Sequence, residues 1–552
     1  MARNGTVALA LTLALAGVAR GASDPAADAI AAALDADLSG SDAGVAVAVW
    51  RDGATIHESV RGRADAERGV DLTPDTPLYL ASTAKQFTAA CIFLLAADHA
   101  LSLDDDVRKH IPELPEYRHV VRLRHLLHHR SGIPDVYESA ILADIPRTSL
   151  NDSAAALEIL RRLDSLDFVP DSQFVYSNSN YVLLAEVVHR VSGKTLAEFA
   201  RERLFGPLGM TSTSFVDDEH GPPANAAVGH SASGAVRDMP RIAGPGGLWS
   251  TVHDLGKWDA NFFTPKVGGP ALIAALTTVP ALPAGTSWSP DIGPYAGGLI
   301  VCPFRGSVSV SHPGGAFGFR SEILRLPEKH LTCVCLTNSE TVDARGWCRR
   351  LAGIALGPPF DAPPRPASGI ATAKVSVQPL IGLFRERDGG GLLSIAQRGD
   401  AFRATMVGTI VPLEQDGTGA LVGSETPIAV RVEPAAAGSI RLRIGDATPR
   451  EFATVERIAS GAGDPTPIAG TYHHSGLDAT ITLAARDGSV VFEQHGVPLL
   501  PIEPFGPLVA DSWVGARNAV LLEVERASDG KVGAVVFRSR GARGMRFERV
   551  RD

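Results

Sequence analysis

The segment Ser82-Thr83-Ala84-Lys85 places a hydroxyl and an amine three residues apart. A helix is predicted to begin there, because apolar residues recur at helical spacing at Phe87, Ala90, Cys91 and Leu94. On a helix, a serine and a lysine at this spacing share one face. A serine hydroxyl attacks only once a base takes its proton, and a lysine whose pKa is depressed by burial can be that base. We therefore predict Ser82 as a nucleophile and Lys85 as its base.

A second serine and lysine at the same spacing occur in Ser528-Asp529-Gly530-Lys531. The Asp-Gly pair inside this segment is typical of a hairpin turn, where the lysine would point to solvent. We therefore discard it as a catalytic candidate.

The next candidate is Tyr176-Ser177-Asn178, which lies ahead of a helix-like run over Tyr181–Glu186. A tyrosine close to a lysine can have its pKa lowered and act as a phenolate base. An asparagine can bridge a lysine and a substrate amide through its donor and its acceptor. Taken alone, the segment is more typical of a tyrosine in a surface loop.

A third candidate is His312-Pro313-Gly314-Gly315, which follows the strand-like alternation of residues 307–311. Glycines on a strand let a ligand approach the main chain closely. The amide of Gly315 is predicted to pair with that of Ser82 as an oxyanion hole, with Gly314 beside it and His312 as a hydrogen-bond donor. The alternative is a histidine that merely ends a strand before a turn.

Taken in order, Ser-x-x-Lys, Tyr-x-Asn and His-x-Gly resemble the motifs of the penicillin-recognising serine hydrolases. The most similar branch holds class C β-lactamases, D-alanyl-D-alanine carboxypeptidases, related esterases and D-aminopeptidases. The resemblance covers most of residues 30–345. Three flanking segments resemble further landmarks of the family: Leu103-Asp104-Asp105, Leu126–Gly132 and Pro207-Leu208-Gly209-Met210.

This resemblance implies a role for each candidate. Ser82 would be acylated, Lys85 and Tyr176 would share the proton transfers, and Asn178 would position Lys85 and the substrate. His312 stands where many β-lactamases carry a lysine, which fits the aminopeptidase and esterase branch. A histidine is mostly neutral at pH 7 and is a weaker anchor for a substrate carboxylate.

The elements that must position these residues are expected in residues 23–357. We predict an α/β domain of the β-lactamase/transpeptidase-like fold, with an antiparallel sheet and a helical subdomain. A proline-rich linker over residues 358–372 follows it, because Pro358-Pro359 and Pro363-Pro364-Arg365-Pro366 favour a stiff, extended chain.

The remaining residues repeat with a period of roughly 90, since Leu380-x-Gly382-x-Phe384 recurs as Ile468-x-Gly470-x-Tyr472. We predict two antiparallel, lipocalin-like β-barrels over residues 373–462 and 463–552. One larger β-sandwich is the alternative. A catalytic domain followed by two barrels resembles the D-stereospecific aminopeptidases, in which a loop of the last barrel reaches the active site. Residues 499–515 are the candidate for that loop.

Residues 1–21 are predicted to be a signal peptide, with an apolar segment over Val7–Val18 and cleavage after Gly21. We expect a periplasmic or secreted protein. No later stretch is apolar enough to span a membrane. The formal net charge of −9 argues against nucleic-acid binding, which requires a basic surface.

Neither a metal nor an organic cofactor is expected, since side chains supply the nucleophile, the base and the oxyanion donors. His125, His128 and His129 lack a carboxylate or cysteine at zinc spacing. The five cysteines give no clear disulfide framework.

The sequence thus predicts a serine hydrolase that cleaves amides or esters through an acyl-enzyme. The expected substrates are short peptides or amides with an N-terminal D-residue. The alternatives are a class C β-lactamase-like esterase or D-alanyl-D-alanine carboxypeptidase, and a catalytically silent penicillin-binding-type module. A homodimer remains open.

Overall fold

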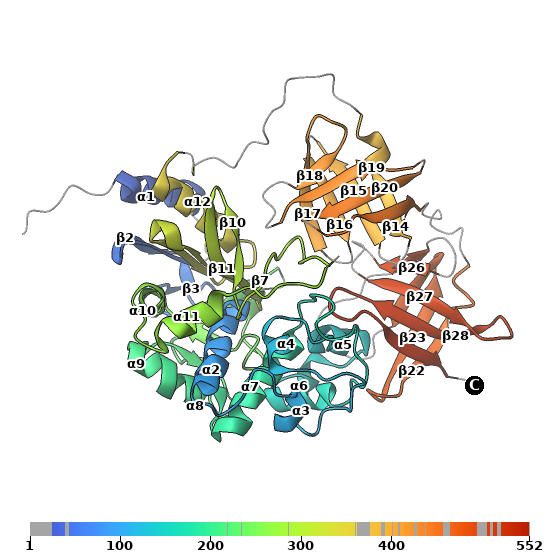
Figure 1. Cartoon of the computed structure of the whole chain (residues 1–552), viewed down its shortest axis with the longest axis horizontal. Coiled ribbons are helices and arrows are strands. Elements are labelled where there is room, and N and C mark those ends of the chain that lie inside the picture. Colours follow the sequence, from blue (N-terminus) through green and yellow to red (C-terminus); the bar gives the residue numbers. More distant parts are fainter. Residues whose placement is uncertain are drawn as a thin grey trace, which may run out of the picture.

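The computed structural model describes most of residues 25–550, and Figure 1 shows an α/β unit beside two barrels. Within that span it does not describe residues 39–43, 218, 233, 285, 359, 361–375, 388–391, 400, 407–408, 424–427, 437, 446, 456–463, 494–504, 508–511 and 516–519. The predicted signal peptide and most of the predicted linker lie outside the described residues.

A six-stranded antiparallel sheet forms the centre of the α/β unit, in the order β10-β11-β12-β13-β1-β2. Strand β13 is mostly apolar and is buried along its whole length, as a central strand covered on both faces must be. The strands are β1 Val45–Arg51, β2 Ala54–Arg61, β10 Ile300–Phe304, β11 Ser307–Ala316, β12 Phe319–Leu326 and β13 Leu331–Thr337. Short strands lie outside this sheet: β3 Arg63–Asp65, β4 Val70–Asp71, β5 Leu78–Tyr79, β6 Ser214–Phe215, β7 Gly229–Ser231, β8 Gly234–Val236 and β9 Leu248–Ser250.

Helices cover both faces of the sheet. The first and last helices, α1 Pro25–Leu38 and α12 Ala344–Leu356, bury side chains such as Leu34 and Leu351 against one face. The other helices build the helical subdomain on the opposite side: α2 Lys85–Ala97, α3 Val107–His110, α4 Leu123–Leu127, α5 Val136–Leu142, α6 Ser153–Leu160, α7 Asn178–Ser192, α8 Leu196–Ala200, α9 Gly206–Leu208, α10 Val252–Phe263 and α11 Gly269–Thr277.

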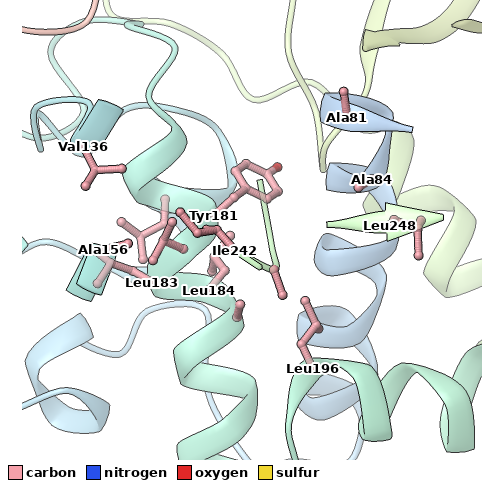
Figure 2. Packing of buried hydrophobic residues seen from close by; sticks show 14 of the residues in the cluster. Ala81, Ala84, Val136, Ala156, Tyr181, Leu183, Leu184, Leu196, Ile242 and Leu248 are labelled. Carbon is pink, nitrogen blue, oxygen red and sulfur yellow. The ribbon is translucent and has the colours of Figure 1, made fainter. Parts of the chain in front are cut away.

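Helices α2 and α7 pack against each other at the centre of the subdomain. Figure 2 shows Tyr181, Leu183 and Leu184 of α7 among side chains from neighbouring elements, with Ala81 and Ala84 in the turn just before α2. The helix that follows the predicted nucleophile is therefore anchored in the apolar core of the domain.

The C-terminal region forms two closed antiparallel barrels. In the first, β14 pairs with β21; in the second, β22 pairs with β29. The first comprises β14 Gly382–Glu386, β15 Leu392–Arg398, β16 Ala401–Met406, β17 Thr409–Gln415, β18 Leu421–Gly423, β19 Val430–Pro434, β20 Ser439–Ile444 and β21 Arg450–Thr454. The second comprises β22 Gly470–His474, β23 Ala479–Arg486, β24 Ser489–Glu493, β25 Phe505–Pro507, β26 Ser512–Gly515, β27 Leu521–Arg526, β28 Val532–Arg538 and β29 Met545–Arg549.

The expected fold class is confirmed, and the alternative of a single large sandwich is wrong. The repeated sequence marks equivalent positions in the barrels: Gly382 and Gly470 open the first strand of each, with φ of +151° and +155°. Such values suit glycine, because they lie where other residues are strained.

The two barrels differ in how their cores join the rest of the protein. Buried side chains of the second barrel, including Tyr472 and Phe547, belong to one apolar cluster that continues into the helical subdomain. The first barrel has its own cluster, centred on residues such as Phe384 and Phe452. Among the residues that the structure describes, only the second barrel thus shares its buried core with the catalytic domain.

The described helices bear on whether the chain spans a membrane, and the five cysteines bear on disulfide formation. None of their helices combines the length and apolar character needed to cross a bilayer. All five cysteines are buried and free, so no disulfide forms among them.

Candidate active site

Ser82 lies in a 3₁₀ turn, Ala81–Ala84 (η1), that leads directly into α2. Ala81 has φ of +46°, a left-handed conformation that costs a residue other than glycine about 1–3 kcal/mol. The turn is tied to the sheet. Thr83 Oγ1 donates to the carbonyl of His312 at 2.9 Å, and Ser321 Oγ donates to the carbonyl of Leu80 at 2.6 Å. Strands β11 and β12 therefore hold the predicted nucleophile in place.

Lys85 is fully buried, and its Nζ has three oxygen neighbours. It lies 3.0 Å from Ser82 Oγ, 2.9 Å from Asn178 Oδ1 and 2.8 Å from the carbonyl oxygen of Pro245. The last two oxygens only accept hydrogen bonds, so they occupy two N–H donors of the amine. When Lys85 is neutral, its lone pair is consequently left to face the Ser82 hydroxyl.

Burial lowers the pKa of Lys85 to about 7, because a desolvated ammonium is unfavourable. The carboxylate of Asp135 opposes this change. Near neutral pH the amine is therefore free to take a proton from Ser82, as the sequence predicts.

Tyr176 faces the same hydroxyl, and its ring centroid lies 4.9 Å from Lys85 Nζ. Burial raises the pKa of Tyr176 above its ordinary value, and the neighbouring Ser82 offsets only part of the rise. The predicted phenolate, with a lowered pKa, is thus wrong for the resting protein. Tyr176 carries its proton and can donate it.

Asn178 begins α7, and its side chain joins Lys85 to a carboxylate. Its Oδ1 accepts from Lys85, and its Nδ2 donates to Asp135 Oδ2 at 2.9 Å. The expected contact with the lysine is present. Because Asp135 takes one of the two N–H donors of the amide, one is left for a substrate.

His312 lies on β11 and is buried, with both ring nitrogens engaged. Its Nδ1 is 2.7 Å from the carbonyl oxygen of Pro313, so Nδ1 carries the proton and donates. Its Nε2 is 3.0 Å from the hydroxyl of Tyr295 and accepts from it. Burial lowers the pKa of His312 to about 3, which keeps the ring neutral. The prediction that His312 donates to the substrate is therefore wrong, although its side chain lines the pocket.

The two glycines on β11 differ in what surrounds them. A Cβ at Gly314 would lie 2.1 Å from the carbonyl oxygen of Leu80, so this glycine is needed for the Ser82 turn to approach the strand. A Cβ at Gly315 would meet only the Arg320 side chain, at 3.2 Å. The segment that approaches Gly314 closely is therefore the turn before Ser82, and not the ligand that the sequence predicts. Gly315 faces the pocket.

A pocket of about 380 Å³ contains Ser82, Tyr176, His312 and both glycines. Arginines also line it: Arg320, Arg345 and Arg540. Arg540 comes from the second barrel and pairs with Asp291 at 2.7 Å. Among the described residues, no carboxylate lies within ion-pair distance of Arg320 or Arg345.

The barrel loop that reaches this pocket joins β28 to β29, at residues 539–544. The candidate predicted for that role, residues 499–515, lies mostly outside the described residues. That candidate therefore stays a prediction, while Arg540 shows that another loop of the last barrel reaches the pocket.

The three histidines considered for a metal engage separate partners through Nδ1. His125 accepts from a main-chain amide of its own turn, His129 accepts from the amide of Ser177, and His128 lies 3.2 Å from the carbonyl of Ala296. No set of three or more candidate metal ligands was found in the described parts of the chain.

Comparison with known proteins shows to which family this chain belongs. The Beta-lactamase family matches residues 27–356, which is more than half of the chain. The chain belongs to the Beta-lactamase family. Within it, the chain is 26% identical to a D-aminopeptidase of Gluconobacter oxydans over 477 residues, covering 84% of this chain and 87% of that protein. It is 26% identical to a D-aminopeptidase of Cereibacter sphaeroides over 502 residues, covering 88% and 90%.

Solved structures show the same fold. The octameric penicillin-binding protein homologue of Pyrococcus abyssi superposes with a TM-score of 0.55 at 21% identity, covering 77% of this chain and 99% of that one. SurE superposes with a TM-score of 0.52 at 21% identity, covering 78% and 99%.

Sequence reasoning missed several residues of this Beta-lactamase family site, among them Asp135, Asp291, Tyr295 and Arg540. Asp135 carried a usable signal, since Asp135-x-x-Glu138 has the spacing of a helix start, and Asp135 does cap α5. The others lie in loops, and no motif marks them.

Proposed function

We propose that this protein hydrolyses short peptides or amides with an N-terminal D-residue through an acyl-enzyme on Ser82. The observation that carries the proposal is the 3.0 Å contact between Ser82 Oγ and Lys85 Nζ, in a site that lowers the pKa of the amine to about 7. The substrate class is supported by the D-aminopeptidases to which the chain is similar over more than four fifths of its length.

In the proposed mechanism, Lys85 takes the Ser82 proton as Oγ bonds to the substrate carbonyl carbon. The main-chain N–H groups of Ser82 and Gly315 stabilise the resulting oxyanion. The C–N bond then breaks as Tyr176 gives its proton to the leaving amine, and the Lys85 ammonium restores that proton. In deacylation Lys85 takes a proton from water as the water oxygen bonds to the ester carbonyl carbon. The bond to Ser82 Oγ then breaks, the Lys85 ammonium returns the proton to Oγ, and the acid is released.

The test is hydrolysis of D-alanine p-nitroanilide and D-alanine amide beside their L-enantiomers. We expect the D-substrates to react faster. Equal or faster hydrolysis of the L-substrates would contradict the proposed stereochemistry while leaving the serine hydrolase chemistry intact.

A second candidate is favoured by Arg320 and Arg345, which have no ion-pair partner among the described residues of the pocket. Two cations can bind a substrate carboxylate. They would thereby supply the positive charge of the lysine that many β-lactamases carry where this chain has His312. This favours the class C β-lactamase-like esterase or D-alanyl-D-alanine carboxypeptidase. Turnover of nitrocefin or of a peptide ending in D-Ala-D-Ala, faster than that of D-alanine p-nitroanilide, would support it. Failure of a fluorophosphonate to label folded protein at Ser82 would instead support a silent module.

Export is also proposed, with Val7–Val18 as the supporting apolar segment. N-terminal sequencing of protein recovered from the periplasm or medium tests cleavage after Gly21. Association as a homodimer stays a prediction, and light scattering of the purified protein tests it.

A further inference from the structure

The loop of residues 539–544 in the second barrel is bonded to the first turn of α5. The main-chain N–H of Asp135 donates to the carbonyl of Gly541 at 2.6 Å. In return, the N–H of Gly541 donates to Glu138 Oε2 at 2.8 Å, and Ser539 donates to the same carboxylate. Figure 1 shows α5 on the side of the catalytic domain nearest this barrel.

Asp135 connects this contact to the start of α7. Its Oδ1 caps α5 by accepting from the amides of Tyr137 and Glu138, at 2.9 and 3.2 Å. Its Oδ2 accepts from the main-chain amide of Asn178 at 2.5 Å and from Asn178 Nδ2 at 2.9 Å. The side chain is buried, so water does not compete for these donors. One carboxylate therefore fixes the beginnings of two helices relative to each other.

The connection ends at the nucleophile. The carbonyl of Gly541 accepts from the main-chain N–H of Asp135, and the carboxylate of Asp135 accepts from Asn178 Nδ2. Asn178 Oδ1 in turn accepts from Lys85 Nζ, which contacts Ser82 Oγ. We propose that Gly541 and Asp135 are positioning residues through which the last barrel orients the amine of Lys85. The proposal rests on the proposed serine hydrolase function, and it makes the second barrel a working part of the active site.

The orientation matters because an amine acts as a base only along its lone pair. Asn178 and Pro245 set the direction of that lone pair, because their oxygens accept hydrogen bonds from the two N–H groups of the neutral Lys85 amine. A displacement of about 1 Å at such a group, caused from outside the site, can cost roughly a hundredfold in rate. The second barrel shares its apolar core with the helical subdomain, so a shift in its loop is passed to rigid neighbours.

The loop itself offers a matched pair of variants. A Cβ added at Gly541 would lie 2.7 Å from Asp135 Cβ and 3.2 Å from Glu138 Oε1, so Gly541→Ala must push α5 or the loop away. A Cβ at Gly544, three residues on in the same loop, would meet nothing within 4 Å. Gly544→Ala is therefore the control for a changed loop that leaves Asp135 alone.

The measurement is the rate at which a fluorophosphonate labels Ser82, followed from pH 5 to 9, since this needs the nucleophile and its base but no particular substrate. We expect Gly541→Ala to lower the rate roughly ten- to a hundredfold and Gly544→Ala to change it less than about twofold. In peptide hydrolysis the loss should appear in kcat with KM nearly unchanged. Equal rates for the two variants would overturn the proposal.

Asp135→Asn provides a second variant in case Gly541→Ala does not fold. Asparagine still caps α5, but its single oxygen cannot serve both the cap and Asn178. Besides a slower rate, the midpoint of the pH profile should move to lower pH, because the carboxylate of Asp135 raises the pKa of Lys85. The other titratable groups packed around this amine stay neutral, because burial lowers the pKa values of His129 and His312 and raises those of Tyr176 and Tyr181. Burial also raises the pKa of Asp135, but the N–H donors of Tyr137, Glu138 and Asn178 favour its carboxylate.

A purely structural role for Asp135 would lower the melting temperature while leaving that midpoint unchanged, and this result would also contradict the proposal. The labelling measurement tests the positioning role separately from the proposed substrate class. Normal labelling of the wild-type protein without hydrolysis of D-substrates would remove the D-aminopeptidase assignment alone.

Discussion

Arg540 of the second barrel and Asp291 of the catalytic domain form an ion pair at 2.7 Å, although 249 residues separate them in the chain. The pair lies between two cavities. One, of about 380 Å³, contains Ser82, and the other, of about 580 Å³, extends between the catalytic domain and both barrels. Tyr176, Ile292 and Arg540 line both cavities. We therefore predict that this contact limits the length of substrate that reaches Ser82.

Replacing Arg540 with alanine should join the two cavities. We expect kcat/KM for a tripeptide with an N-terminal D-residue, relative to the matching dipeptide, to rise about tenfold. Arg546→Ala is the control, because Arg546 lies on β29 of the same barrel and makes a half-exposed ion pair with Glu525. An unchanged ratio in Arg540→Ala would mean that the ion pair does not limit substrate length.

Loss of the nucleophile or of its base should abolish turnover. Ser82→Ala and Lys85→Arg should each lower kcat by three or more orders of magnitude, since a guanidinium stays charged and cannot accept the proton. Circular dichroism checks that the variants fold. Ser528→Ala, in the second Ser-x-x-Lys segment, should retain full activity because Lys531 is exposed. Residual turnover near the wild-type level in Ser82→Ala would rule out the acyl-enzyme.

The rate should depend on pH through Lys85. Its pKa is lowered to about 7, so the fraction of neutral amine, and with it kcat/KM, rises about tenfold per pH unit below pH 7 and then levels off. Because burial raises the pKa of Tyr176, its proton stays in place and no decline is expected up to about pH 9. A profile that is flat from pH 5 to 9 would argue against Lys85 as the base.

The two glycines of β11 should respond differently to a methyl group. Gly314→Ala would force a Cβ to within 2.1 Å of the Leu80 carbonyl, which should destabilise the fold by about 1–3 kcal/mol and displace the Ser82 turn. Gly315→Ala would meet only the flexible Arg320 side chain. We expect it to keep its melting temperature and to weaken substrate binding. Thermal melts and kcat/KM together separate the two effects, and equal melting temperatures would contradict the first.

Much of the site could be predicted from sequence, because the three motifs are local. Spacing alone brings Ser82 and Lys85 onto one helix face, and alternation alone predicts the first part of the strand that carries His312 and continues to Ala316. What the sequence could not provide depends on contacts between distant segments. The Tyr295 hydroxyl donates a hydrogen bond to Nε2 of His312. Burial by several elements raises the pKa of Tyr176, whereas the sequence predicts that it is lowered.

The same limit applies to the barrels. The repeat centred on Gly382 and Gly470 predicted both, since each barrel is built from hairpins that are close in sequence. Which loop meets the catalytic domain is decided by docking, which leaves no periodic signal. The sequence therefore did not point to Gly541, whose small size is required only by its neighbours Asp135 and Glu138.

The distribution of apolar cores has a consequence for how the protein comes apart on heating. The second barrel and the helical subdomain share one core, so neither can melt without exposing the other, and they should unfold as a single cooperative unit. The first barrel touches its neighbour through a small cluster that includes Leu383 and Leu521, and through the pair Arg385–Glu523. It should melt separately, so that calorimetry resolves two transitions and only one of them coincides with loss of activity.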